Sequence, residues 1–138
     1  MVVVKSRFTM KNILKKTVLT LILACTITLV NAQTVVDNIG TSLGNGNVAA
    51  IAKYFDNAVS MSVAASPATY SRSQAEMVLR HFFTKNPAKK FTINHSGDND
   101  GNSHAIGTLH TSNGSYRTYF AVKQKDGQYI IQELRIEK

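Results

Sequence analysis

Three side chains that together could bind a small molecule lie on either side of one predicted turn. His110 precedes the dipeptide Asn113-Gly114, and Arg117 and Tyr119 follow it. An imidazole, a guanidinium and a phenol around an apolar floor suit a small anionic or carbonyl-bearing ligand. The alternative is that His110 and Arg117 reach solvent at a sheet edge while Tyr119 belongs to the core. We take the three as candidate ligand-binding residues.

The carboxylates give little support to acid–base catalysis. That chemistry needs a carboxylate or histidine with a tuned pKa beside an electrophilic partner. Most Asp and Glu residues fall in predicted helices and turns, and Glu133 is expected on the sheet face opposite the candidate ligand-binding residues. An isomerase- or hydrolyase-like enzyme would therefore use His110 alone, with Arg117 and Tyr119 polarising the substrate. We keep it as the alternative to a non-catalytic binding module.

Two patterns contain metal-ligand residue types, and both are incomplete. His95 and His104 would face each other across a hairpin about 5 Å apart, but zinc needs a third or fourth ligand. Residues 98–102, Asp-Asn-Asp-Gly-Asn, suggest a calcium loop, but the glycine comes too early for an EF-hand and Leu109 replaces the required glutamate. The sequence predicts no metal and no cofactor.

The elements that position these residues begin with two short helices. Apolar residues at helical spacing predict a helix over 34–43 and a second one after Asn47, which is a good N-cap. Residues 59–63 alternate like a short strand, and 64–70 predict a loop.

The clearest helix is predicted to begin near Ser71. Two overlapping capping boxes occur there, one pairing Ser71 with Gln74 and the other pairing Ser73 with Glu76. Asn86-Pro87 ends the helix, because the residue before a proline avoids the helical region.

The second half of the mature chain predicts four strands, at Lys89–Ser96, Ser103–Ser112, Ser115–Lys125 and Gln128–Glu137. Asn113-Gly114 and Asp126-Gly127 predict type I′ turns, in which both central residues have positive φ. Helices followed by an antiparallel meander indicate an α+β domain with helices on one face of a sheet.

Tight turns fix strand register, so the faces of the sheet can be predicted. A turn at Asn113-Gly114 pairs His110 with Arg117. The face with the candidate ligand-binding residues also carries Phe91, Ile93, Ile106, Ile130, Leu134 and Ile136, and we expect the helices to cover it. The other face carries Phe120, Val122, Tyr129 and Ile131, which is too apolar for open water and predicts a dimer interface. A bulge in one strand would change both assignments.

The helix start 70–76 (Tyr-Ser-Arg-Ser-Gln-Ala-Glu), the pair Phe82-Phe83 and the closing strand 129–137 resemble the nuclear-transport-factor-2-like (cystatin-like) superfamily, and within it an exported bacterial domain of unknown function. The resemblance covers nearly all of 33–138. It implies a curved, cone-shaped sheet, with Gln132 joining His110, Arg117 and Tyr119 as the polar lining of the cone. It implies no single activity, because this fold hosts isomerases, dehydratases and non-catalytic binding or dimerisation domains.

The first 32 residues are typical of an export signal. Three lysines, Lys11, Lys15 and Lys16, precede the mostly apolar stretch 17–30, and Val30-Asn31-Ala32 suits a signal peptidase. The apolar stretch is shorter than the roughly 20 residues that a membrane-spanning helix needs. Cleavage would leave 33–138 as one domain, periplasmic or secreted. A lipoprotein anchored through Cys25, the only cysteine, is a minor alternative.

Most of the excess positive charge belongs to this signal. The chain carries 16 Lys and Arg against 8 Asp and Glu, and five of the basic residues precede residue 33. The mature domain therefore has a net charge of only +3, which argues against a nucleic-acid partner. We expect an exported homodimer that binds a small molecule or a protein.

Overall fold

A computed structural model of the chain describes residues 32–138. The predicted export signal up to Asn31, with Cys25 inside it, lies outside the described residues. Among the described residues, no helix is both long and apolar enough to cross a membrane.

The first two helices form where helical spacing predicted them. Helix α2 (Ala32–Asn45) includes the predicted 34–43, and α3 (Val48–Ala52) begins after Asn47, whose side chain accepts a hydrogen bond from the Ala50 amide at 3.2 Å. The chain then turns into strand β1 (Phe55–Val63), which is longer than the predicted strand over 59–63. A short strand, β2 (Ala68–Ser71), replaces part of the predicted loop.

Helix α4 (Arg72–Lys85) has the start and the end that the sequence predicts. Ser71 Oγ accepts a hydrogen bond from the Gln74 amide at 3.3 Å, and Gln74 Oε1 accepts one from the Ser71 amide at 3.0 Å. Asn86 is the C-cap, directly before Pro87. Glu76, expected in a second capping box, instead pairs with Arg80 one turn along the helix.

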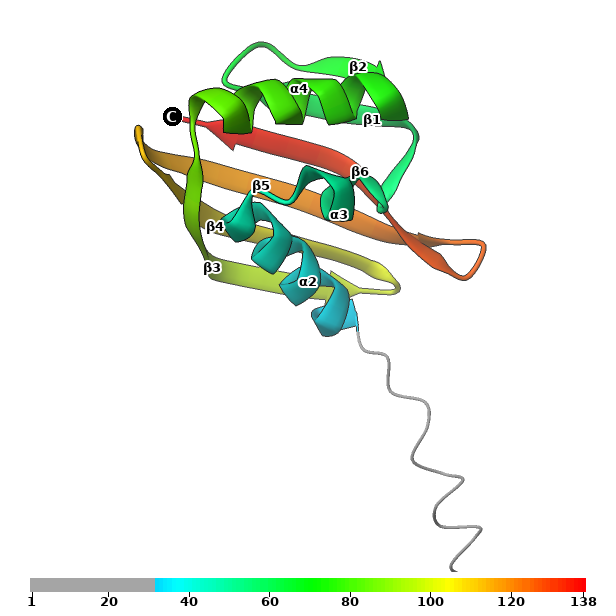
Figure 1. The fold of residues 1–138 in the computed structure, drawn as a ribbon. Helices are drawn as coiled ribbons and strands as arrows, with labels where there is room; N and C mark the ends of the chain where they lie inside the picture. Colours follow the sequence, from blue (N-terminus) through cyan, green and yellow to red (C-terminus); the bar gives the residue numbers. More distant parts are fainter. Residues whose placement is uncertain (1–31) are drawn as a thin grey trace, which may run out of the picture. The chain divides into compact units, whose positions relative to one another are not determined.

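Six strands form one curved, open sheet in the order β2-β1-β6-β5-β4-β3 (Figure 1). Strands β3 (Ala88–Asn99), β4 (Asn102–Thr111), β5 (Gly114–Lys125) and β6 (Gln128–Glu137) form the predicted antiparallel meander. Strand β1 runs parallel to β6, so the sheet is mixed and β6 lies between β1 and β5. The α+β fold class is therefore confirmed.

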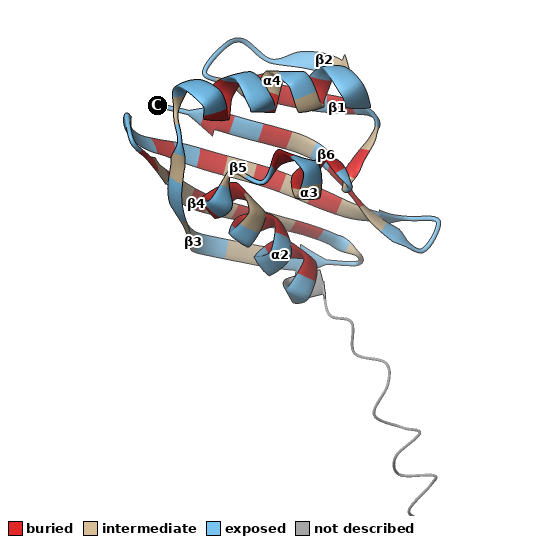
Figure 2. Ribbon diagram, viewed as in Figure 1, coloured by how far each residue is buried: buried red, intermediate tan, exposed pale blue. Residues whose placement is uncertain are grey.

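The three helices lie on one face of the sheet, and the core fills the space between them and the strands (Figures 1 and 2). This buried set combines helix residues with strand residues, among them Ile39, Leu43, Ile51, Leu79, Phe55, Leu109, Phe120, Val122, Ile131, Leu134 and Ile136. The opposite face of the sheet, here called the outer face, carries no helix of residues 32–138.

Two of the three hairpin turns of the meander differ from the prediction. Asp126-Gly127 forms the expected tight turn, with φ of 51° and 76°. Asp100-Gly101 has nearly the same φ angles and closes the β3–β4 hairpin. The predicted strands leave a longer, six-residue loop there, over 97–102. Between β4 and β5 the turn residues are Ser112-Asn113, because Thr111 pairs with Gly114.

Contacts with the end of α4 explain the displaced turn. The Asn113 side-chain amide donates to the Lys85 carbonyl at 2.6 Å, and the Ser112 backbone amide donates to the Pro87 carbonyl at 2.9 Å. The displacement places His110 opposite Ser115 and not opposite Arg117, so that predicted pairing is wrong.

Two strand irregularities change which side chains face the helices. The pairing with β5 shifts at Gln132 in β6, and the pairing with β4 shifts at Asn94 in β3. An extra residue moves every later side chain of its strand to the other face. The shift at Gln132 buries Leu134 and Ile136 on the helix side, together with Ile131 that precedes it.

The predicted assignment of the two faces is therefore inverted for β4, β5 and the part of β6 before Gln132, whereas Phe91, Ile93, Leu134 and Ile136 lie on the helix side as predicted. Phe120, Val122 and Ile131 are at most 1% exposed and pack under the helices, so they cannot form the predicted dimer face. Tyr129 is half-buried against the same core. Arg117 and Tyr119 lie on the outer face and do not line the inside of a cone.

Candidate functional site

The outer face of the sheet contains a hollow of about 300 Å³. Its lining comes from three neighbouring strands: Ile106 from β4, Arg117 and Tyr119 from β5, and Arg135 and Glu137 from β6. We call it the Tyr119 hollow. It combines an apolar floor, an aromatic ring, two guanidinium groups and one carboxylate.

Tyr119 and Arg135 are direct neighbours across β5 and β6. The guanidinium carbon of Arg135 lies 5.0 Å from the centre of the Tyr119 ring, within the range of a cation–π interaction. Arg135 Nε also donates to Glu133 Oε1 at 2.6 Å. This hydrogen bond and the charge of Glu133 raise the pKa of Arg135 above its usual value. Arg135 is thus held in position by two partners, the Tyr119 ring and the Glu133 carboxylate.

Arg117 differs from Arg135 in having no ionic partner in the part of the chain that the structure describes. Its backbone lies opposite that of Glu137, but Arg117 makes no ion pair with any of residues 32–138. The side chain is exposed. Its guanidinium can therefore bind a ligand without first breaking an internal ion pair.

Of the four predicted ligand-binding residues, the structure brings two together. Arg117 and Tyr119 share the hollow, but His110 and Gln132 do not line it. His110 is half-buried farther along the outer face, with Nδ1 3.1 Å from Ser115 Oγ. Gln132 is exposed at the irregularity of β6.

The sequence interpretation missed Arg135 and Glu137. Register extended from the β5–β6 turn without a bulge puts Arg135 on the same face as Phe120 and Val122, opposite Arg117 and Tyr119. The spacing of apolar residues does not reveal the inserted residue, because 129, 130 and 131 are all apolar and Ile130 continues the even series of Leu134 and Ile136.

The two histidines considered for metal binding lie beside the hollow. The ring centres of His95 and His104 are 6.1 Å apart, and His104 is 6.4 Å from Tyr119. They are not directly opposite, because His95 pairs with Ile106 after the shift in β3. No group of three His, Cys, Asp or Glu residues suited to a metal ion occurs among the described residues.

The side of the sheet under the helices contains little that could carry acid–base chemistry. The buried polar side chains of the described residues, apart from Tyr116, are Ser62, Ser103, Thr111 and Thr118. Two large aromatic residues, Phe55 and Phe82, are buried in the core between the helices and the sheet. Arg117, Tyr119, Arg135 and Glu137, which line the Tyr119 hollow, are on the outer face instead.

Comparisons with known proteins agree with this fold. The model of a domain of unknown function, DUF4783, matches residues 36–137. A DUF4783 family protein from Bacteroides ovatus is 32% identical, with 73% of this chain and 92% of that chain covered and a TM-score of 0.70. One from Bacteroides fragilis is 30% identical, with 73% and 95% covered and a TM-score of 0.69.

More distant proteins share the fold alone. An NTF2-like protein of unknown function from Cytophaga hutchinsonii is 11% identical over 80% of this chain and 92% of that one, with a TM-score of 0.58. Among curated proteins, none matches the chain. The chain therefore belongs to the DUF4783 family of domains of unknown function, and its domain has the NTF2-like α+β fold.

Proposed function

We propose that the mature domain is an exported, non-catalytic module that binds a small anionic molecule in the Tyr119 hollow. The observation that carries this proposal is the exposed Arg117 guanidinium, which has no ionic partner among the described residues and lies beside an aromatic ring and an apolar floor. A ligand carboxylate can accept two parallel hydrogen bonds from one guanidinium. An apolar part of the same ligand would pack on Tyr119 and Ile106.

The charges around the hollow restrict the ligand further. Arg135 is already engaged with Glu133, so it supports the ring and adds positive potential without being the main anion ligand. Glu137 lines the hollow as well and repels a second negative charge. The expected ligand is a monocarboxylate with an apolar group of moderate size.

The arrangement favours binding over the alternative isomerase- or hydrolyase-like enzyme. That enzyme would need His110 inside an enclosed pocket, whereas His110 lies on the outer face next to Ser115. Among the described residues, no hydrogen bond to a third group orients the His110 ring. A serine–histidine pair without an orienting group or an oxyanion site lacks the parts of an acyl-transfer centre.

Export is the part of this proposal that rests on the sequence alone. A basic region, an apolar stretch and a peptidase site at Val30-Asn31-Ala32 support cleavage before Gln33. Native mass spectrometry of protein purified from the envelope of its own host would test it. A species that begins at Gln33 is expected; retention of residues 1–32, or a lipid on Cys25, would contradict it.

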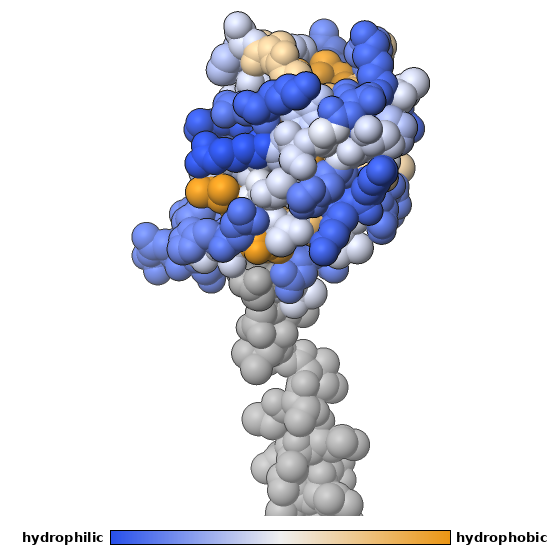
Figure 3. Space-filling model, turned by 90° about the vertical axis from the view of Figure 1, so that its left-hand side faces the viewer, coloured by the Kyte–Doolittle hydropathy of each residue, from blue (hydrophilic) through white to orange (hydrophobic). Residues whose placement is uncertain are grey.

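A second copy of the domain is the other candidate occupant of the outer face. Strands β5 and β6 present two arginines and two glutamates there, so two such faces related by a two-fold axis could pair their charges. The surface seen in Figure 3 is mostly hydrophilic, and Met77 on α4 is the single large apolar side chain exposed among the described residues. Such a dimer would be salt-sensitive, and sedimentation at low and high salt would detect it.

The ligand proposal predicts a specific effect of Arg117→Ala. Benzoate, a small aromatic monocarboxylate, is the probe, and benzamide is its neutral counterpart. We expect Arg117→Ala to weaken benzoate binding by roughly fivefold to tenfold, because an exposed charge-assisted hydrogen bond contributes about 1 kcal/mol. NMR titration of backbone amides in β4, β5 and β6 measures the effect.

The matched control is Arg72→Ala, which removes an exposed arginine at the start of α4. It should leave benzoate binding unchanged. Equal affinity for benzamide and benzoate, or the same loss in both arginine variants, would overturn the assignment of the anion site to Arg117.

A further inference from the structure

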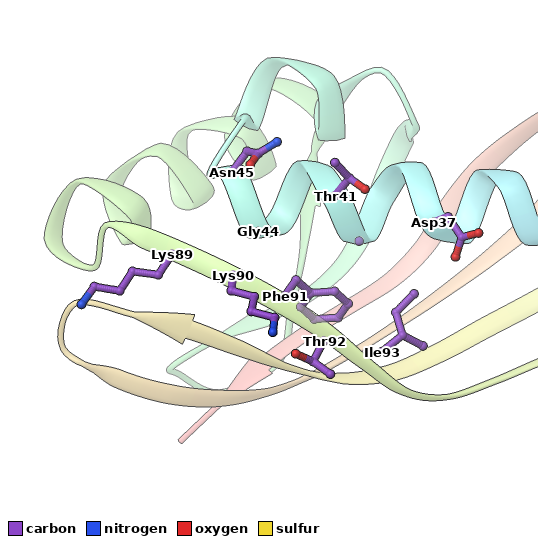
Figure 4. A pocket seen from close by; sticks show the side chains of 10 residues that line it. Asp37, Thr41, Gly44, Asn45, Lys89, Lys90, Phe91, Thr92 and Ile93 are labelled. Atoms are coloured by element: carbon purple, nitrogen blue, oxygen red, sulfur yellow. The ribbon is translucent and has the colours of Figure 1, made fainter.

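A groove of about 580 Å³ lies between helix α2 and strand β3, apart from the Tyr119 hollow (Figure 4). Polar helix residues, among them Asp37, Thr41 and Asn45, form one wall. Five consecutive strand residues, 89–93, form the other wall. The helix wall from residue 37 to 45 is about 12 Å long at 1.5 Å per residue. The groove is therefore elongated along the strand.

Two glycines of α2 bring the helix directly onto the strand. A Cβ atom at Gly44 would lie 2.8 Å from the Phe91 backbone nitrogen, and one at Gly40 would lie 3.1 Å from the Phe91 ring. This close approach leaves Phe91 and Ile93 half-buried beneath the helix. They give the groove an apolar floor between two polar rims.

Strand β3 is the last strand of the sheet, so one of its edges has no neighbouring strand from residues 32–138. An edge strand presents backbone N–H and C=O groups that an extended peptide can pair with. The pairing of β3 with β4 is irregular at Lys89 and again at Asn94. The regular stretch between them, Lys90–Ile93, offers a ladder for about four residues of an added strand.

The groove has positive charge at one end. Lys89 and Lys90 are both exposed, and neither makes an ion pair with any residue from 32 to 138. Figure 4 shows Lys89 at the end of the groove opposite Asp37, and Lys90 between Lys89 and Phe91 with its side chain on the side of the strand away from α2. A carboxylate near the lysines would complement this charge.

We infer that this groove docks an extended segment of another protein that carries an acidic residue. The segment adds to the free edge of β3, with alternate side chains on Phe91 and Ile93 and its carboxylate at Lys89 and Lys90. A second copy of this chain fits less well, because edge-to-edge pairing along Lys90–Ile93 would bring the lysine pairs of both copies onto one short ladder.

The test uses labelled hexapeptides and the mature chain, residues 33–138. The first peptide alternates valine and glutamate, the second alternates valine and lysine, and the third is the acidic peptide with N-methyl groups on alternate residues. We expect binding of the acidic peptide only, because the lysine peptide repels the groove and N-methylation removes the donors of a β-ladder. Fluorescence anisotropy measures affinity, and amide NMR shifts locate the site.

A charge-reversal variant then assigns the anionic contact. Lys89→Glu with Lys90→Glu should weaken binding of the acidic peptide by about tenfold or more at low salt. The matched control is Lys53→Glu with Lys123→Glu, which makes the same change of charge outside the groove and should bind as the unmodified domain does.

Several outcomes would overturn the inference. These are equal binding of the acidic and lysine peptides, equal binding of the N-methylated peptide, shifts confined to the outer face, or no binding by any probe. A dimer whose β3 edges pair would also overturn it, because the groove would then belong to a second copy.

Discussion

Asp56 illustrates how a few local contacts set the charge state of one residue. Its Oδ1 accepts a hydrogen bond from the Asn57 amide at 2.8 Å, and its Oδ2 lies 3.1 Å from Lys125 Nζ. The Asn57 hydrogen bond, followed by the Lys125 contact, lowers the pKa of Asp56 below its usual value of 3.8. The Lys125 contact also joins β5 to the start of β1, which is far away in the sequence.

At this scale we predict a stability difference that depends on pH. A carboxylate whose pKa is lower in the folded state stabilises the fold fully above its unfolded pKa, and this contribution is lost as pH falls through the folded pKa. Asp56→Asn should therefore destabilise the domain at neutral pH, and the difference from the unmodified domain should vanish in strong acid. Urea unfolding at several pH values measures it.

Asp126→Asn is the control for this prediction. Asp126 takes a φ of 51° in the β5–β6 turn, a conformation that asparagine adopts as readily as aspartate. Its effect on the free energy of unfolding should be small. An Asp56→Asn difference that persists unchanged into strong acid would contradict the role given to the carboxylate.

Among the elements, helix α4 connects the two halves of the sheet. It packs beside β1 and β2 and delivers the chain to β3 at the opposite edge (Figure 1). At its end, Tyr116 from β5 donates to Asn86 Oδ1 at 3.1 Å, and its ring lies 5.1 Å from that of Phe82. The start of α4 depends on the reciprocal hydrogen bonds between Ser71 and Gln74.

We predict that Ser71→Ala lowers the free energy of unfolding by about 1 kcal/mol, because the Gln74 amide loses its cap. Ser73→Ala is the matched control, since Ser73 Oγ only contacts Ser71 Oγ at 3.3 Å, and it should cost less than about 0.5 kcal/mol. Urea unfolding of both variants provides the comparison. Equal effects would mean that the second predicted capping box, at Ser73, also contributes.

The sequence predicts those parts of the fold that depend on neighbouring residues. The capping box at Ser71 and the turn at Asp126-Gly127 are local, and both form as expected. The Ser112-Asn113 turn was missed because contacts with α4, distant in sequence, select it. The shifts at Gln132 and Asn94 were missed for a related reason: sheet curvature under the helices requires them, and turn chemistry does not encode that curvature.

The same distinction between local signals and contacts distant in sequence explains how much of the candidate site the sequence predicts. Arg117 and Tyr119 are two positions apart on one regular strand, so they share a face whatever the register. Arg135 joins them only through the shift at Gln132. The groove beside β3 was not predicted, because it depends on where α2 crosses the strand.

At the scale of the whole molecule, the core and the Tyr119 hollow lie on opposite faces of the sheet. Buried residues fill the helix side (Figure 2), and the outer face carries the side chains that line the hollow. Phe120 and Tyr119 are adjacent in sequence and point to opposite faces. Phe120 is 0% exposed, whereas Tyr119 is half-buried in the hollow.

This separation predicts contrasting effects of two neighbouring substitutions. Phe120→Ala should lower the free energy of unfolding by about 3–5 kcal/mol through lost burial and a new cavity. Tyr119→Ala should cost less than about 1.5 kcal/mol and should abolish most of the benzoate binding. Urea unfolding and the NMR titration measure the two effects. A larger loss of stability for Tyr119→Ala would contradict the assignment of the faces.

The central position of β6 in the sheet affects when, during its synthesis, the chain can fold. Strand β6 comes last in the described chain, yet it lies between β1 and β5, and Met61 of β1 pairs with Leu134. Until residues 128–137 have been synthesised, β1 and β2 have no strand to join to the meander. A contact of such long range makes folding slow as well as late. The polypeptide would therefore stay unfolded for most of its synthesis, which is compatible with the proposed export across a membrane before folding.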